Sequence, residues 1–244
     1  IRQLEAIREF APHCRYYNAG TSEEMGDVSY SPQDEKHPPR PRSPYGASKV
    51  AARQIIKVYR DSYNLFAIQG WLYNHESPRR GISYVTRKIT SWAAKAGKSL
   101  LTHSPPPVLT LGNLDACRDW SDARDFVRAI WMMLNLSEPT EYVVSSGKTR
   151  TVREFLCHAM ECVGLEFVAM DLKGEFDSEG RKLAYINPDR NALVEVSKEF
   201  YRPAEVDTLL GDSSAFKKAT GWKPKIGFRE MIHDMVEKDI SLLE

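Results

Sequence analysis

Residues 43–74 read SPYGASKVAARQIIKVYRDSYNLFAIQGWLYN, a helical pattern followed directly by a strand-like one. Ser43 and Pro44 are typical of a helix start, because serine caps free N–H groups and proline fits the first turn. The ten residues from Leu65 to Asn74 form a largely apolar run, which is typical of a parallel strand covered on both faces. Between them, one apolar face predicts a helix to about Tyr63. That face consists of Ala47, Val50, Ala51, Ile55 and Val58.

The rest of the chain continues this alternation of helix and strand. A spacing of three between Leu4, Ile7 and Phe10 predicts a helix that ends before Pro12. Arg15–Asn18 is interpreted as a short buried strand. Further helices are predicted at Ser121–Leu136, from the capping box Thr151–Glu154 to about Val163, at Ser214–Thr220 and at Phe228–Leu243, with a strand at Glu141–Ser146. Helices and strands in this order indicate a doubly wound α/β fold.

The composition excludes several classes of protein. The 244 residues include 34 basic and 33 acidic ones, with a formal net charge of +1, which argues against a nucleic-acid surface. No stretch approaches the roughly 18 apolar residues of a membrane span, and no signal peptide opens the chain. The four cysteines form no CxxC pair and no Cys/His ligand spacing. We therefore expect no nucleic-acid or membrane partner, no metal, reduced thiols and a cytoplasmic location.

A tyrosine and a lysine at the head of the first long helix suggest acid/base chemistry. Tyr45 and Lys49 stand four residues apart, so they share one helix face. Free tyrosine, with a pKa of about 10, is a poor base at neutral pH, and a nearby ammonium group stabilises a phenolate. This spacing alone is a weak signal, because it occurs by chance in many helices.

The segment after the preceding strand adds to this signal. AGTSEEMG (Ala19–Gly26) places Thr21 and Glu23 at the carboxyl edge of the predicted sheet, where α/β proteins bind ligands. A hydroxyl after one strand and a Tyr/Lys pair on the next helix favour a hydride-transfer site, and the Glu23 carboxylate adds a second base. Glu23 could instead be a solvated turn residue or the cap of a short helix.

A second polar cluster follows the apolar strand. NHESPRRG (Asn74–Gly81) holds two adjacent arginines, a histidine and an asparagine, a set that can bind phosphates and ribose. A charged surface loop is the alternative. RDW (Arg118–Trp120) and YRPAEVD (Tyr201–Asp207) supply further guanidinium groups, each of which carries little weight alone.

Seven segments together resemble the GDP-mannose 4,6-dehydratase family, within the extended short-chain dehydrogenase/reductase superfamily. They extend from about Tyr16 to the C-terminus and read AGTSEEMG, PRSPYGASK, NHESPRRG, YVTRKI, LGNLDACRDW, YRPAEVDTLLGD and GWKPKIGF. Tyr-x-x-x-Lys marks the superfamily only. NHESPRRG followed by VTRKI and YRPAEVD is specific to a much narrower group of proteins. A match to all of these segments in the same order does not arise by chance.

The resemblance implies that GDP-mannose is converted to GDP-4-keto-6-deoxymannose, with NADP retained on the enzyme. It implies that Tyr45 takes the proton of the hexose C4 hydroxyl and that Thr21 hydrogen-bonds the same oxygen. Lys49 would hold the nicotinamide ribose. Glu23 would remove the C5 proton, after which water leaves from C6 and the hydride returns there. Two proton transfers need two groups, which accounts for a hydroxyl and a carboxylate after one strand.

Other positions match ligand-binding positions of the family. His75 and Arg80 match positions that contact the cofactor, as Tyr45 and Lys49 do. The positions that match the GDP-sugar site are Asn74, Lys88, Arg118 and Arg202. The expected partners are thus NADP and GDP-mannose, with a homodimer or homotetramer at full length.

The sequence departs from the family pattern in three places. It contains no G-x-x-G-x-x-G turn, and we expect this turn, with the first strand, in roughly a hundred residues before Ile1. We accordingly expect residues 1–244 alone to bind NADP weakly. Ser121-Asp122 stands where the family usually has Gly-His. The stretch Gly174–Asn191 has no clear counterpart and is interpreted as a variable insertion.

The sequence therefore predicts an α/β chain: the C-terminal part of a doubly wound, Rossmann-like parallel-sheet domain with a smaller mixed α/β substrate domain. Residues 1–73 would belong to the NADP-binding domain and 74–244 mainly to the GDP-sugar-binding domain, with about 112–146 returning to the first. Two alternatives stay open. One is another nucleotide-sugar dehydratase, epimerase or reductase of the superfamily, although a plain reductase needs no Glu23. The other is a non-catalytic remnant that binds nucleotide sugar.

Overall fold

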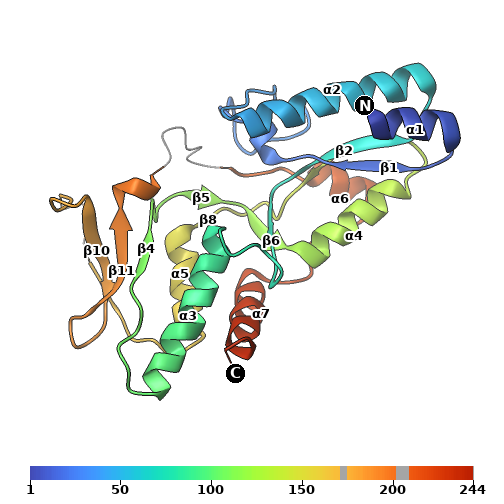
Figure 1. The fold of residues 1–244 in the computed structure, drawn as a ribbon. Coiled ribbons are helices and arrows are strands. Elements are labelled where there is room, and N and C mark those ends of the chain that lie inside the picture. The colour runs from blue at the N-terminus through green and yellow to red at the C-terminus, as the bar shows by residue number, and fades with distance from the viewer. Residues whose placement is uncertain (171–174, 202–208, 244) are drawn as a thin grey trace. The chain divides into compact units, whose positions relative to one another are not determined.

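The computed structural model describes residues 1–170, 175–201 and 209–243, which fall into two compact units (Figure 1). Unit 1 comprises residues 1–75, 118–149 and 206–226, and unit 2 comprises 76–117, 150–205 and 227–244. Unit 1 thus also takes in a C-terminal segment that the sequence-based division did not assign to the first domain. What each unit binds stays a prediction.

Unit 1 is built on a parallel sheet of three strands in the order β1-β2-β7. The strands are β1 (Tyr16–Ala19), β2 (Ala67–Leu72) and β7 (Val143–Val144). Tyr16 pairs with Ala67, and Trp71 pairs with Val143. Parallel strands joined through helices confirm the predicted α/β class.

Helices cover both faces of this sheet. α1 (Arg2–Phe10) and α2 (Pro44–Tyr63) contribute to a small core around Ala67, whereas α4 (Ala123–Leu134) and α6 (Ser214–Thr220) contribute to a larger core around Ile68. Because side chains alternate along a strand, Ala67 and Ile68 point to opposite faces. The arrangement is visible in Figure 1, where α1 and α2 lie on the side of β1 and β2 away from α4 and α6.

Local signals set the two ends of α2 where the sequence predicts them. The Ser43 hydroxyl accepts a hydrogen bond from the Gly46 N–H at 3.0 Å, and proline occupies the first turn. The helix ends at Asn64, whose φ of 51° is left-handed. The prediction of a helix from Pro44 to Tyr63 is confirmed.

Most of the apolar face predicted on α2 lies outside the core, although Ile55 packs against the small core around Ala67. Ala47, Ala51 and Val58 are exposed, and Val50 and Ile55 are only half-buried. The buried residues of the helix are Gly46, Arg53 and Ile56. The inward stripe therefore includes a charged side chain, which is possible because carboxylates from other segments pair with it.

α4 begins two residues later than predicted. Ser121 and Asp122 belong to the short strand β6 (Trp120–Asp122). The Asp122 carboxylate accepts a hydrogen bond from the Arg124 N–H at 2.8 Å and so caps the helix. Because Asp122 is the N-cap residue, its backbone is extended, and it lies just before the helix that the sequence pattern predicted from Ser121.

Unit 2 contains a mixed sheet of four strands in the order β4-β11-β10-β9. The strands are β4 (Leu109–Leu111), β9 (Val168–Ala169), β10 (Arg181–Ile186) and β11 (Ala192–Ser197). β11 runs parallel to β4 and antiparallel to β10. The stretch interpreted as an insertion thus supplies a central strand of this sheet.

Three helices pack together in unit 2: α3 (Val85–Leu101), α5 (Val152–Glu161) and α7 (Phe228–Ser241). α5 begins at the predicted capping box, since the Thr151 N–H donates to Glu154 Oε2 at 2.7 Å. α3 was not predicted, although buried Ile89, Trp92, Ala93 and Ala96 recur at helical spacing. The short elements are η1 (Ser22–Glu24), β3 (Asn74–Glu76), β5 (Cys117–Arg118), β8 (Arg150–Thr151) and η2 (Lys198–Phe200).

Membrane, metal and thiol features can be stated for the described ranges. Within residues 1–170, 175–201 and 209–243, no helix has the length and hydropathy needed to cross a bilayer. In the same part of the chain, no group of three or more His, Cys, Asp or Glu side chains is placed to hold a metal ion. All four cysteines carry free thiols. The expected cytoplasmic location stays a prediction.

Candidate functional site

The turn after β1 holds two of the predicted catalytic residues. The Thr21 hydroxyl accepts a hydrogen bond from the Glu23 N–H at 3.3 Å, and the Thr21 N–H donates to Glu24 Oε1 at 3.0 Å. The carboxylate that caps η1 is therefore that of Glu24, as the spacing Thr-x-x-Glu indicates. The half-buried Glu23 carboxylate takes no part in the cap.

The first turn of α2 lies directly against this turn. A Cβ at Gly46 would come within 2.6 Å of the Glu23 carbonyl oxygen, so only glycine permits the approach. Lys49 Nζ lies 5.6 Å from the centre of the Tyr45 ring and donates to the Ala19 carbonyl oxygen at 2.8 Å. The Tyr45 side chain is 54% exposed. The turn with Thr21 and Glu23 and the helix with Tyr45 and Lys49 thus meet at the carboxyl end of β1.

Two more predicted residues follow β2 in unit 1. Asn74 Oδ1 is buried and has no hydrogen-bond partner among the described residues. His75 Nδ1 lies 2.8 Å from the Tyr73 carbonyl oxygen, and because that oxygen can only accept, Nδ1 donates. The His75 ring stacks on Phe126 with centroids 4.8 Å apart. The imidazole is thereby held in one plane and one tautomer.

Arg80 belongs to unit 2, where its neighbours hold its side chain. Its Nε lies 3.3 Å from Glu76 Oε2, and its guanidinium lies 3.7 Å from the centre of the Tyr84 ring. Glu76 also accepts a hydrogen bond from the Thr86 hydroxyl at 2.7 Å. Burial raises the pKa of the Glu76 carboxyl, while Arg80 acts in the opposite direction.

Lys88 is held on α3 in unit 2. Its Nζ donates to the Thr110 carbonyl oxygen at 2.6 Å and lies 4.3 Å from the centre of the Phe200 ring. Burial lowers the pKa of Lys88. An ammonium group in such a position gains from contact with an anion.

Arg118 and Arg202 are the remaining predicted site residues. Arg118 is half-buried at the end of β5 and belongs to unit 1. Arg202 lies outside the described residues. The structure therefore brings Thr21, Glu23, Tyr45 and Lys49 together, and it places Asn74, His75 and Arg118 in the same unit.

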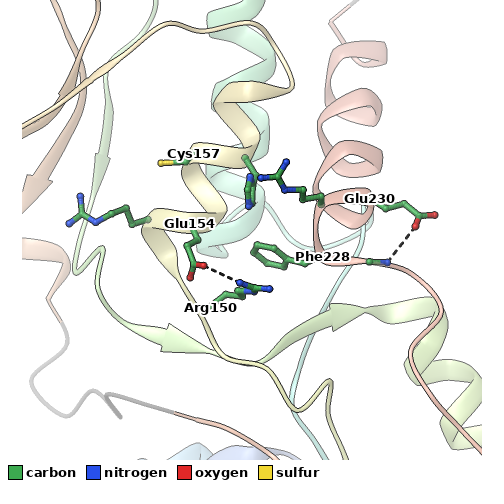
Figure 2. Close-up of a pocket in the computed structure, with 9 residues that line it drawn as sticks. Arg150, Glu154, Cys157, Phe228 and Glu230 are labelled. Carbon is green, nitrogen blue, oxygen red and sulfur yellow. Dashed lines mark hydrogen bonds and ion pairs between the residues drawn. The ribbon is translucent and has the colours of Figure 1, made fainter.

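An open groove in unit 2 contains none of the predicted site residues (Figure 2). It has a volume of about 820 Å³ and is lined by the starts of α5 and α7. Arg150 and Glu154, both at the start of α5, form an ion pair at 3.2 Å, and Glu230 accepts a hydrogen bond from the Gly227 N–H at 3.4 Å. The predicted catalytic residues lie outside this groove, in unit 1.

Sequence reasoning missed a group of buried polar residues beneath the site. Glu24, Arg53 and Gln69 are all buried and bond to one another. Two signals were present: the Thr-x-x-Glu spacing of the cap, and an arginine within a helix predicted to be half apolar. Neither signal shows that the two charges meet, because 28 residues separate Glu24 from Arg53 along the chain.

Solved structures share this fold at low sequence identity. A UDP-glucose 4-epimerase from Thermotoga maritima, solved with UDP-glucose, superposes with a TM-score of 0.76 at 18% identity, over 99% of this chain and 68% of that one. The protein RMD from Pseudomonas aeruginosa, solved with NADPH, gives 0.75 at 21% identity, over 93% and 66%. At such identities the likeness establishes the fold alone.

Relatives at higher identity are GDP-mannose 4,6-dehydratases. The GDP-mannose 4,6-dehydratase of Vibrio cholerae serotype O1 is 43% identical over 248 residues, covering 99% of this chain and 65% of the relative. That of Cricetulus griseus is 40% identical over 245 residues, covering 100% and 63%. The chain thus spans less than two thirds of the length of these relatives. The family model described as GDP-mannose 4,6 dehydratase matches residues 1–235, and the chain belongs to this family.

Proposed function

We propose that the protein containing this chain converts GDP-mannose to GDP-4-keto-6-deoxymannose with loss of water. The observation that carries the proposal is the close approach of the Thr21–Glu23 turn to the helix with Tyr45 and Lys49. Family membership supports the choice of substrate. The reaction needs a proton taken from oxygen and another taken from carbon, and this end of the sheet offers a phenol and a carboxylate.

The first proton transfer is assigned to Tyr45. Its phenolate, with the Lys49 ammonium nearby, takes the proton of the C4 hydroxyl and becomes the phenol. The Thr21 hydroxyl already accepts from the Glu23 N–H, so its own proton remains to be donated to the sugar oxygen. Thr21 therefore orients the oxygen that Tyr45 deprotonates.

The second proton transfer is assigned to Glu23. Oxidation at C4 makes the C5 hydrogen acidic, and the Glu23 carboxylate removes it. The carboxyl then passes this proton to the C6 hydroxyl, which leaves as water. When the hydride returns to C6, the proton held on Tyr45 goes to C5. Glu24 rather than Glu23 caps η1, which leaves the Glu23 carboxylate for this role.

The cofactor is proposed to be NADP, which when bound accepts a hydride from C4 and returns it to C6. Residues of this chain fit the nicotinamide half of such a group. The Lys49 ammonium and the Tyr45 phenol suit a ribose hydroxyl. His75 and Arg80 are proposed to complete the contacts. NADP is preferred to NAD on the family resemblance, and RMD was solved with NADPH.

The GDP-sugar is proposed to contact Asn74, Lys88, Arg118 and Arg202. Lys88 offers a half-buried ammonium on a rigid helix, and Arg118 a half-buried guanidinium. Positive groups of this kind suit a diphosphate. A homodimer or homotetramer of the full-length protein is proposed on the family resemblance.

The test is transfer of a label within the product. The protein as its gene encodes it is incubated with NADP and GDP-mannose that carries deuterium at C4. The proposal expects a 4-keto product with deuterium at C6. A product that keeps the C6 hydroxyl would indicate another reaction of the superfamily, and binding without product would indicate a non-catalytic protein.

A further inference from the structure

A buried ion pair lies beneath the turn that carries Thr21 and Glu23. The side chains of Glu24 and Arg53 are 1% and 9% exposed. Arg53 Nε donates to Glu24 Oε2 at 2.6 Å, and Nη2 donates to Oε1 at 3.3 Å, so the contact is a two-pronged fork. Such buried pairs seldom add stability over apolar residues of similar volume. A role other than stability is therefore worth seeking in their other contacts.

Glu24 connects three segments of unit 1 through one carboxylate. Besides Arg53 on α2, its Oε1 accepts from the Thr21 N–H at 3.0 Å and from Gln69 Nε2 on β2 at 2.9 Å. Gly20 leaves room for this convergence, because a Cβ there would lie 2.8 Å from Glu24 Oε1. The Glu24 carboxylate thus anchors the main chain of the turn at Thr21.

Arg53 lies on α2, the helix that carries Tyr45, and so connects this helix to Glu24. Its Nη1 donates to the Gln69 carbonyl oxygen and to Glu141 Oε2, the latter at 2.8 Å, and its guanidinium lies 3.5 Å from the centre of the Trp71 ring. Gln69 Nε2 also donates to the Lys49 carbonyl oxygen at 3.0 Å. The helix is therefore held at the very turn that bears the lysine.

We propose that Glu24 and Arg53 are positioning residues. Their ion pair, together with the hydrogen bonds of Gln69, fixes the Thr21–Glu23 turn relative to the helix that carries Tyr45. This inference rests on the proposed function. Neither residue touches the substrate. Their effect is exerted through distance, since misplacing a catalytic group by about 1 Å can cost about 100-fold in rate.

The decisive variant replaces both charges at once, as Glu24→Leu with Arg53→Met. Apolar replacement of a buried pair commonly costs little, but the Thr21 N–H and Glu141 also lose partners here, so the variant should fold with a lowered melting temperature. The Thr21 N–H loses its acceptor, and hydrogen exchange in residues 18–26 should become faster. With misplaced groups, kcat should fall about 10- to 100-fold while KM for GDP-mannose stays within about threefold.

Arg60→Met is the matched control. Arg60 lies on the same helix and donates to Glu141 Oε1 at 3.1 Å and to the Ala67 carbonyl oxygen at 2.9 Å. It makes no contact with Glu24. The control should leave both kcat and the exchange of residues 18–26 unchanged.

Unchanged exchange in residues 18–26 together with kcat within about twofold of wild type would overturn the inference. If the double variant does not fold, Arg53→Lys decides by the same two readings, because it keeps the charge and loses the fork. A wild-type protein without dehydratase activity would refute the proposed function instead. The exchange reading needs no turnover and would still test the positioning.

Discussion

Gly46 lies so close to Glu23 that a Cβ on the glycine would come within 2.6 Å of the Glu23 carbonyl oxygen. This approach joins the turn after β1 to the helix with Tyr45. Because the neighbouring atom is main chain, it cannot move aside as the end of a side chain could. The distance between the turn with Thr21 and Glu23 and the helix with Tyr45 therefore depends on the absence of a methyl group at position 46.

Gly46→Ala should separate the turn from the helix. We expect a loss of about 1–3 kcal/mol in the free energy of unfolding, as in other overpacked sites, and a fall in kcat. Thermal unfolding and steady-state kinetics measure the two effects. Gly227→Ala is the control, since a Cβ there meets nothing within 4 Å. Equal behaviour of the two variants would show that the close approach is not required.

Arg118→Ala should raise KM for GDP-mannose more than it lowers kcat. A guanidinium that binds the diphosphate acts equally on substrate and transition state, which is uniform binding. Loss of one charge-assisted contact corresponds to about 1.5–3 kcal/mol, or roughly a 10- to 100-fold change. Steady-state kinetics at varied GDP-mannose concentration measures it.

The matched control for Arg118 is Arg229→Ala, in the groove of unit 2. It should leave KM unchanged. The opposite pattern, with KM sensitive to Arg229 and not to Arg118, would move the substrate site to the groove. A fall in kcat alone on changing Arg118 would place that residue nearer the reacting atoms.

Glu76→Gln tests the electrostatics of unit 2. Burial raises the pKa of the Glu76 carboxyl above its ordinary value of 4.5, so the folded state binds the proton more tightly than the unfolded state. The stabilising contribution is present below that value and is lost as the pH rises through the folded pKa. The glutamine variant lacks this loss, so its stability relative to wild type should improve as the pH rises from 4.5.

Urea unfolding of both proteins at several pH values measures the Glu76 effect. Glu179→Gln is the control, because the Glu179 side chain is largely exposed. A difference between Glu76→Gln and wild type that does not vary with pH would contradict the assignment. So would a decline of the variant's relative stability at higher pH, which would mean that the Arg80 ion pair outweighs burial.

Structural features that depend on a few neighbouring residues were predicted well from the sequence. Ser43 and Pro44 mark the start of α2, and the Thr151–Glu154 box starts α5, because caps and turns involve adjacent groups. The alternation of helix and strand then gave the doubly wound fold. The hydroxyl, carboxylate and Tyr/Lys pair could be assembled because carboxyl ends of parallel strands share one edge.

Features that depend on distant partners could not be predicted. Apolar periodicity selected the outer face of α2, yet Arg53 faces inward because Glu24 and Glu141 neutralise it there. Those partners lie 29 and 88 positions from Arg53 in sequence. No local pattern reveals such a meeting. The close approach at Gly46 was missed for the same reason, since a glycine in a helix start carries no sign of what it touches.

The assignment of proton transfer to Tyr45 is tested most directly by Tyr45→Phe, measured in the protein as its gene encodes it. Tyr63→Phe, on an exposed tyrosine of the same helix, is the matched control. The account predicts that Tyr45→Phe abolishes turnover while the affinity for GDP-mannose changes little, because the phenol acts in the transition state and contributes one hydrogen bond to the ground state. Tyr63→Phe should behave as wild type. A Tyr45→Phe protein with near-normal kcat would contradict the account.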